Sequence, residues 1–260
     1  MNDIVNDGGL AGCGVLITRP EHQSKELAAE VEAAGGNVFH FPAIDIIGRD
    51  ILDIGREFAS LDTPDIVIFV SSNAVAYGLP VVQGIETKIA AVGPATCASI
   101  EALHVDVDIS PTDGFDSEHL LGHTSLQAVD GMNVIIMRGQ SGRELLGDTL
   151  RERGAKVDYL CVYNRIPHVP TLADLEDLES ALNQQRIQFV TVLSAETVEF
   201  LVQILPPQSL GLLRKSTLVA PSARVLQTAS ELIPGITTEL VQGPQATAVV
   251  NTLIELRQTG

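Results

Sequence analysis

The chain contains one α/β pattern twice, and this repeat limits its possible folds more than any other feature. Residues 15–40 (VLITRPEHQSKELAAEVEAAGGNVFH) align without a gap with residues 134–159 (VIIMRGQSGRELLGDTLRERGAKVDY) at an offset of 119. Each segment begins as an apolar run that ends in an arginine, Arg19 or Arg138, and continues as an amphipathic helix. Each helix ends at a glycine sixteen residues after that arginine, before a second apolar run. The pattern predicts two copies of a β-α-β unit.

The similarity continues downstream of both copies. Residues 64–78 resemble residues 187–201 at an offset of 123, and the next matching pair places Gly93 opposite Ala220 at an offset of 127. Rising offsets are typical of loops that differ in length, and the period is that of a domain rather than of a solenoid repeat. We therefore expect two similar α/β domains with a ligand cleft between them, because clefts between domains are common small-molecule sites.

Composition narrows the class of protein. Hydrophobic residues make up 45% of the chain, which is typical of a globular protein rather than a disordered one. The net charge of −17 argues against nucleic acid and anionic membranes as partners, because both bind through lysine and arginine. The acidic N-terminus is not a secretory signal, and no apolar run is long enough to span a bilayer. Three isolated cysteines favour a reduced, cytoplasmic location without disulfides.

Strand and helix patterns alternate along the chain. Strands are predicted at residues 13–18, 37–41, 66–71, 89–92, 105–109, 133–137, 157–162, 189–193, 217–220 and 237–241. Helices are predicted at residues 21–35, 73–78, 95–103, 116–128, 141–153, 172–184, 195–204, 222–232 and 245–257. Strands that are apolar on both faces and alternate with helices indicate parallel sheets covered by helices.

Two extended segments interrupt this alternation. Residues 39–47 contain Pro42, and residues 159–170 end in two prolines, which confine a strand to an edge or to its first position. We interpret them as paired strands that cross between the domains. The first βα unit then joins the C-terminal half. One domain would comprise residues 1–41 and 168–260, the other residues 48–160, with linker strands at 42–47 and 161–167.

Six junctions between a strand and a helix share small and polar residues. They are Thr18-Arg19-Pro20, Ser71-Ser72-Asn73, Gly93-Pro94-Ala95-Thr96, Arg138-Gly139-Gln140-Ser141-Gly142, Ser194-Ala195-Glu196 and Ala220-Pro221-Ser222. Ligands bind outside the carboxyl ends of parallel strands, and helix N-termini attract carboxylates and phosphates. For any single junction, ordinary N-capping is the better explanation, because Ser, Thr and Asn are the preferred caps. Six junctions in two matched lobes, two of them with arginine, favour a ligand rich in anionic groups.

Three kinds of side chain are candidates for chemistry. Arg19 and Arg138 occupy equivalent strand ends. Each either makes a bidentate hydrogen bond to a ligand carboxylate or forms a structural ion pair. Tyr163 lies in the second extended segment, where it is either a proton donor in a cleft or a tyrosine packed at a domain edge. His119 and His123 have helical spacing but no third metal ligand, so a solvated helix face explains them better.

Taken together, these segments resemble the uroporphyrinogen-III synthase family over nearly the whole chain. The resemblance lies in the order and spacing of VLITRP, FPAIDI, DIVIFVSSNAV, IAAVGPAT, VIIMRGQSGRELL, LCVYNRIP, VTVLSAETVEF and VAPSA. It implies two flavodoxin-like α/β domains joined by a two-stranded ladder. It also implies a cyclising lyase of haem biosynthesis that converts hydroxymethylbilane to uroporphyrinogen III through a spiro intermediate, with inversion of ring D and loss of water.

The resemblance also implies roles for individual residues. Tyr163 falls on the tyrosine of the family and is the candidate general acid, whose loss would weaken activity rather than abolish it. With the junction residues, the predicted substrate contacts are Thr18, Arg19, Ser71, Ser72, Asn73, Gly93, Pro94, Ala95, Thr96, Arg138, Gly139, Ser194, Ala195, Pro221 and Ser222. The resemblance implies neither metal nor cofactor, and we expect a monomer in transient contact at most with the preceding pathway enzyme.

Two other functions are consistent with the same residues. A two-lobed binding protein for a tetrapyrrole or another polycarboxylate would use the same strand ends without catalysis. A regulatory homologue would retain the fold without turnover. Supplying fresh hydroxymethylbilane and resolving the product isomers distinguishes these functions from the synthase, because the bilane cyclises unaided to the type I isomer.

Overall fold

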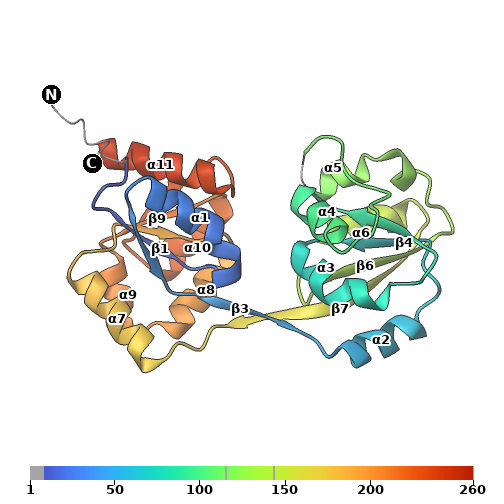
Figure 1. Ribbon diagram of the computed structural model, residues 1–260, viewed down its shortest axis with the longest axis horizontal. Helices are drawn as coiled ribbons and strands as arrows, with labels where there is room; N and C mark the ends of the chain where they lie inside the picture. The colour runs from blue at the N-terminus through green and yellow to red at the C-terminus, as the bar shows by residue number, and fades with distance from the viewer. Residues whose placement is uncertain (1–8, 115, 143, 260) are drawn as a thin grey trace. The chain divides into compact units, whose positions relative to one another are not determined.

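Alternating strands and helices build two α/β units in the computed structural model, which describes residues 9–114, 116–142 and 144–259 (Figure 1). The split unit takes the chain up to Asp45 and again from Ile166, and the middle unit takes Ile46–Arg165. Two strands cross the unit boundaries, β3 (Ile44–Gly48) and β7 (Lys156–Pro167). These strands are hydrogen-bonded neighbours, so a two-stranded ladder joins the units, as the resemblance implied.

The split unit is built on a five-stranded sheet in the order β10-β9-β8-β1-β2, and every pair in it is parallel. Its described elements are β1 (Gly14–Ile17), α1 (Glu21–Ala33), β2 (Asn37–His40), α7 (Leu172–Asn183), β8 (Phe189–Thr191), α8 (Ala195–Ile204), α9 (Pro207–Leu213), β9 (Thr217–Ala220), α10 (Ala223–Leu232), β10 (Thr237–Leu240) and α11 (Ala246–Thr259).

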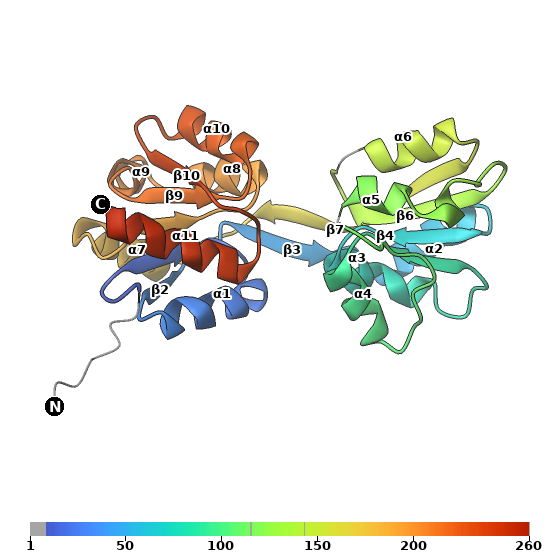
Figure 2. The same cartoon turned by 90° about the horizontal axis from the view of Figure 1, so that it is seen from above.

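Helices cover both faces of this sheet because its central strands are apolar on both sides. Along β1, Leu16 packs into the core beneath α7, α8, α9 and α10, while Val15 and Ile17 pack beneath α1 and α11. Helices α1 and α11 contact each other although they lie at opposite ends of the sequence (Figure 2). One face of the split-unit sheet is therefore covered by α1 and α11 together.

The middle unit has a second five-stranded sheet, in the order β3-β7-β6-β4-β5. Its remaining described elements are α2 (Ile51–Ser60), β4 (Ile66–Phe69), α3 (Ser72–Gly78), the 3-10 turn η1 (Leu79–Val81), β5 (Lys88–Ala91), α4 (Pro94–Glu101), α5 (Ser117–Leu121), the 3-10 turn η2 (Thr124–Leu126), β6 (Asn133–Gly139) and α6 (Leu145–Glu152).

In the middle unit, alternate residues of the central strands pack into two separate cores. Phe69 and Met137 pack with residues of α2, α3 and α4 on one face, while Ile68 and Ile136 pack with residues of α5 and α6 on the other. Helices α3 and α4 contact each other within the first of these layers (Figure 2). Both units are thus three-layered α/β structures, and the predicted fold class is confirmed.

The internal repeat is visible in the order of the two sheets. Strands β2, β1, β8 and β9 follow one another in the split unit, as β7, β6, β4 and β5 do in the middle unit. The two copies of the repeat also end alike. At the end of α1 the Gly36 N–H donates to Val31 O, and at the end of α6 the Ala155 N–H donates to Leu150 O.

Both helix ends depend on a glycine in the left-handed region. Gly35 has a φ of 82° and Gly154 a φ of 88°, and each follows the last residue of its helix by two positions. This geometry matches the Schellman motif, in which a left-handed residue lets the chain satisfy carbonyls of the last turn. The glycine that closes each sequence repeat therefore has the same structural role in both units.

Two predicted elements are wrong in detail. Residues 105–109 form no strand, and only Ile109 makes a bridge to Ala90, because the Asp108 carboxylate accepts the Ile89 N–H in place of a ladder bond. The helix predicted at 116–128 stops at Leu121, since His123 turns extended and its side chain caps η2 instead. Helices α2 and α9 were not predicted.

Candidate functional site

A pocket of about 170 Å³ in the middle unit lies at the carboxyl ends of β4, β6 and β7. The described residues that line it are Val70, Ser71, Ser117, Ile136, Arg138, Gly139, Ser141, Gly142, Leu146, Tyr159, Tyr163 and Arg165. This lining includes two arginines and three serines but no acidic residue, although the chain has a net charge of −17. The lining is therefore locally positive on a chain of negative net charge, which suits an anionic ligand.

Tyr163 is almost wholly buried in this pocket, with 1% of its surface exposed. Its hydroxyl accepts a hydrogen bond from Arg165 Nη2 at 3.1 Å and lies 3.3 Å from Ser71 Oγ, where either oxygen can donate. In the sheet it pairs with Gly139, at a point where the register of β6 and β7 shifts. A Cβ on residue 139 would lie 2.8 Å from Tyr163 Cε2, so only glycine leaves room for the ring.

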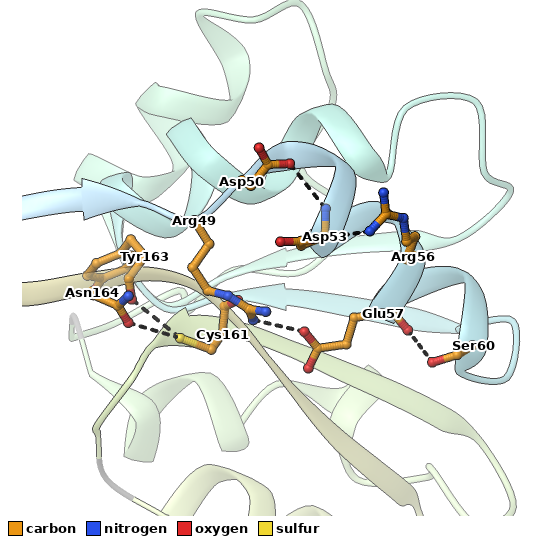
Figure 3. Close-up of polar contacts among 9 residues, drawn as sticks. All are labelled: Arg49, Asp50, Asp53, Arg56, Glu57, Ser60, Cys161, Tyr163 and Asn164. Carbon is orange, nitrogen blue, oxygen red and sulfur yellow. Dashed lines mark hydrogen bonds and ion pairs between the residues drawn. The ribbon is translucent and has the colours of Figure 1, made fainter.

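The strand that carries Tyr163 is anchored just before it by Arg49 (Figure 3). Arg49 Nη1 donates to the Cys161 carbonyl at 2.6 Å and to Glu57 Oε2 at 2.8 Å, and the Arg49 N–H donates to the Val162 carbonyl. The hydrogen bond to Glu57 is the main reason that the pKa of Arg49 is raised. These bonds join β7, just before Tyr163, to Arg49 in the segment before α2 and through Arg49 to Glu57 within that helix.

Arg138 combines an ion pair with an unused donor. Its Nη2 donates to Glu144 Oε1 at 2.8 Å, which lowers the pKa of that carboxyl group, and its guanidinium lies 4.1 Å from the centre of the Tyr159 ring. Its Nη1 is buried and has no hydrogen-bond partner among the residues that the structure describes. Both sequence interpretations of Arg138 are therefore compatible with the geometry: it has a structural partner and a donor left for a ligand.

The junction serines are helix caps. Ser71, Ser194 and Ser222 each accept an N–H of the first turn, at the starts of α3, α8 and α10 respectively. Ordinary capping therefore accounts for these three oxygens, although Ser71 also contacts Tyr163. The remaining predicted contacts of the middle unit are not among the described residues that line the pocket: Ser72, Asn73, Gly93, Pro94, Ala95 and Thr96.

In the split unit, the predicted residues follow three adjacent strands. Thr18 and Arg19 follow β1, Ser194 and Ala195 follow β8, and Pro221 and Ser222 follow β9. All six therefore lie at the carboxyl ends of parallel strands, on the same side of the sheet. Thr18 is buried, and its hydroxyl donates to the Thr191 carbonyl at 2.7 Å. This bond gives Thr18 a structural role between neighbouring strands.

Arg19 repeats the arrangement of Arg138 in part. Its Nη2 donates to the Pro244 carbonyl at 3.3 Å, and its Nε is buried without a hydrogen-bond partner among the described residues. Burial lowers the pKa of Arg19, against the opposing effect of Glu26. The equivalent arginines of the two repeats thus each keep one donor nitrogen unsatisfied, which is unusual for buried polar groups.

Known proteins match this chain over most of its length. The family model described as "Uroporphyrinogen-III synthase HemD" matches residues 25–241. The uroporphyrinogen-III synthase of Proteus mirabilis is 32% identical over 198 residues, which cover 74% of this chain and 96% of that protein. The chain belongs to the uroporphyrinogen-III synthase family. The Escherichia coli synthase is 29% identical over 201 residues, covering 74% of this chain and 80% of its own length.

Solved structures of uroporphyrinogen-III synthases share the fold. The Helicobacter pylori protein aligns with a TM-score of 0.65 and 14% identity, over 94% of this chain and 99% of its own. A mutant of the Thermus thermophilus synthase aligns with a TM-score of 0.58 and 17% identity, over 95% of this chain and 99% of its own. The predicted family is confirmed, and with it the activity class of a cyclising lyase of tetrapyrrole biosynthesis that acts on a small molecule. The alternative of a non-catalytic binding protein is not favoured.

Besides apolar residues of the lining, three residues of this synthase pocket with polar groups were missed in the sequence. Tyr159 and Arg165 lie in β7 with Tyr163, and their place in that extended segment was the signal for them. Strand alternation does not group them, because Tyr159 and Tyr163 pack into opposite cores across the shift in register. Ser117 begins α5 and had no comparable signal. Sequence alone identified Ser71, Arg138, Gly139 and Tyr163 as candidates, and the structure brings these four together.

The described part of the synthase offers neither a metal cluster nor a membrane span. No three His, Cys, Asp or Glu residues among those described lie close enough together to hold a metal ion. His119 lies in α5 and pairs with Asp116, whereas His123 lies beyond the end of that helix, so they do not share one helix face. No described helix is both long and apolar enough to cross a bilayer.

Proposed function

We propose that this chain converts hydroxymethylbilane to uroporphyrinogen III, and that the middle-unit pocket takes part in the reaction. The observation that carries the proposal is the pocket itself, whose described lining includes a buried phenol and two arginines but no acidic residue. The bilane carries eight carboxylates and a hydroxyl group that must leave. The pocket supplies a cationic side chain for a carboxylate and a proton donor for the leaving hydroxyl group.

Arg138 is the proposed carboxylate contact. Its buried Nη1 has no partner among the described residues, and a guanidinium nitrogen left unsatisfied gains most from a charged acceptor. The neighbouring segment contributes Ser141 and Gly142 to the same lining, so a bound carboxylate would meet small side chains there. We extend the proposal to Ser71, Gly139 and, at the edge of the split unit, Arg19.

Tyr163 is the proposed general acid. Its phenol gives a proton to the hydroxyl of the bilane, which departs as water and leaves an electrophilic azafulvene carbon. The substituted carbon of ring D attacks that electrophilic carbon to give a spiro intermediate, which fragments and re-closes with ring D inverted. A proton released on re-closure returns to the phenolate. The net reaction is loss of water, so it requires no oxidant or reductant.

Orientation carries the rest of the catalysis. The bilane is flexible and cyclises unaided to the type I isomer, so the protein has to hold it in a conformation that favours attack by the substituted carbon of ring D. Fixing reacting groups in this way is worth several orders of magnitude in rate. Contacts at the other strand ends serve this role in the proposal: Thr18, Ser72, Asn73, Gly93, Pro94, Ala95, Thr96, Ser194, Ala195, Pro221 and Ser222.

The proposal includes the setting of the enzyme. We propose that it works as a monomer in the cytoplasm, with transient contact at most to the enzyme that supplies the unstable bilane. All three cysteines are free, which supports a reducing compartment. Sedimentation of the purified protein at several concentrations tests the monomer.

Product analysis tests the function. Fresh hydroxymethylbilane is added to the protein, the products are oxidised to porphyrins, and the type I and type III isomers are separated. We expect the type III isomer to dominate, and heat-denatured protein to give type I only. Type I product at the uncatalysed rate would contradict the proposal, and tetrapyrrole binding without turnover would instead indicate a regulatory homologue.

Replacing Arg138 with glutamine tests the carboxylate contact. We expect KM for the bilane to rise about tenfold, because one charge-assisted hydrogen bond is worth about 1.5–3 kcal/mol, while kcat changes much less. The matched control is Arg214→Gln, which removes an exposed arginine from the split unit and the same unit of charge. Equal effects of the two variants would mean that overall charge, rather than the pocket, attracts the substrate.

A further inference from the structure

The hydroxyl of Tyr163 has a second arginine beside it. Arg165 Nη2 donates to this oxygen at 3.1 Å, and the guanidinium carbon lies 5.5 Å from the centre of the Tyr163 ring. Both side chains leave β7 two residues apart and line the same pocket. An arginine only donates hydrogen bonds and stays charged at all working pH values. The phenol oxygen is therefore the acceptor in this contact.

This contact restricts where the phenol proton can point. With one lone pair occupied by Arg165, the Tyr163 O–H is left to donate to Ser71 Oγ at 3.3 Å or to a ligand in the pocket. Ser71 Oγ already accepts the Ala74 N–H at 3.1 Å, and its own hydroxyl proton gives it a second role as donor. A substrate hydroxyl of good geometry can thus replace Ser71 as the acceptor of the phenol proton.

We propose that Arg165 is a positioning residue for Tyr163, which directs the phenol proton toward the substrate and stabilises the oxygen after that proton has left. The inference rests on the proposed role of Tyr163 as general acid. The proton passes from the phenol to the substrate hydroxyl, the C–O bond breaks, and water departs. The negative charge left on the phenol oxygen then faces a guanidinium at hydrogen-bond distance in a site shielded from water.

A different role for Arg165 predicts different kinetics. An arginine in this pocket can also bind a substrate carboxylate directly, and its loss would then raise KM whether or not Tyr163 carries a hydroxyl group. An arginine that acts through the phenol affects kcat, and only while the phenol is present. A double-mutant cycle separates these two cases.

The experiment compares Arg165→Gln, Tyr163→Phe and the double variant in the full chain. We expect Arg165→Gln to lower kcat for the type III isomer about tenfold with little change in KM, in line with the loss of one charged hydrogen bond. Arg165→Lys, which keeps the charge, is expected to restore part of kcat. The double variant is expected to be no slower than Tyr163→Phe alone. Arg214→Gln again serves as the control for charge.

Each other outcome has a definite meaning. If the effects of Arg165→Gln and Tyr163→Phe multiply, or if Arg165→Gln changes KM alone, the inference is wrong and Arg165 contacts the substrate directly. If Tyr163→Phe leaves kcat unchanged, the proposed general acid fails and the inference falls with it. If Arg165→Gln does not fold, the same cycle with Arg165→Lys decides, since a loss of kcat that persists without the phenol contradicts the inference.

Discussion

We expect Tyr163→Phe to lower kcat for the formation of uroporphyrinogen III by about 100-fold. This factor is at the lower end of the rate enhancement that general acids contribute. Activity should fall rather than vanish, because holding the bilane in one conformation continues without the hydroxyl group. The lost hydroxyl is the atom that accepts from Arg165 and contacts Ser71, while the buried ring keeps its packing against the core. Initial rates with resolved isomers measure the effect.

The matched control is Tyr77→Phe in the same unit. The rings of Tyr77 and Tyr163 are 6.2 Å apart, and the Tyr77 hydroxyl donates to the Ile46 carbonyl at 3.4 Å, away from the pocket lining. We expect this variant to keep kcat within about twofold, since it loses one long hydrogen bond. Similar losses in the two variants would show that packing of the tyrosines, and not proton donation, determines the rate.

Gly14→Ala should produce the largest loss of stability among single methyl additions in the split unit. Gly14 begins β1, and a Cβ there would overlap the backbone carbonyl oxygen of Arg186 and approach Phe39 Cε2 to 2.7 Å. A backbone carbonyl cannot move aside as the end of a side chain can, so the sheet has to shift. We expect the free energy of unfolding to fall by about 3 kcal/mol, as in overpacked cores.

Chemical denaturation, with hydrogen exchange to assign each transition to its unit, measures this loss. The control is Gly211→Ala in α9, where the added Cβ would meet nothing within 4 Å. We expect that variant to be neutral or to gain up to about 1 kcal/mol, because alanine favours the helix. A Gly14→Ala protein as stable as its parent would show that β1 and the chain around Arg186 adjust without cost.

The fold was largely predictable because its central strands consist of residues that are buried on both faces. Runs such as residues 66–69 have no polar side to mistake for a surface. Prediction failed where side chains replaced backbone pairing. Val105 and Val107 suggested a strand, but the Asp108 carboxylate takes the hydrogen bond that would have extended it. Helix α2 begins with a cap from Asp50, a signal that the extended segment before it, with Pro42, obscured.

The pocket was predictable only in part. Ser71, Arg138 and Gly139 stand at strand ends, where position in the sequence indicates position in the sheet. Arg165 lies inside β7, which continues past Tyr163 to Pro167, so it does not stand at a strand end. The residues after β8 and β9 lie at the predicted edge, but their roles as substrate contacts stay predictions, since the cap bonds of Ser194 and Ser222 explain their positions.

The split unit is made of two separate segments of the chain, and this affects the order in which the units can fold during synthesis on the ribosome. β1 and β2 are made early, but β8, which pairs with β1, begins 149 residues after β2 ends at His40. At about 5–20 residues per second, this interval lasts on the order of ten seconds. The middle unit is made within it, so we expect that unit to fold first, while Val15 and Ile17 still await most of their core. Protease digestion of stalled nascent chains would show the middle unit protected before the N-terminal segment.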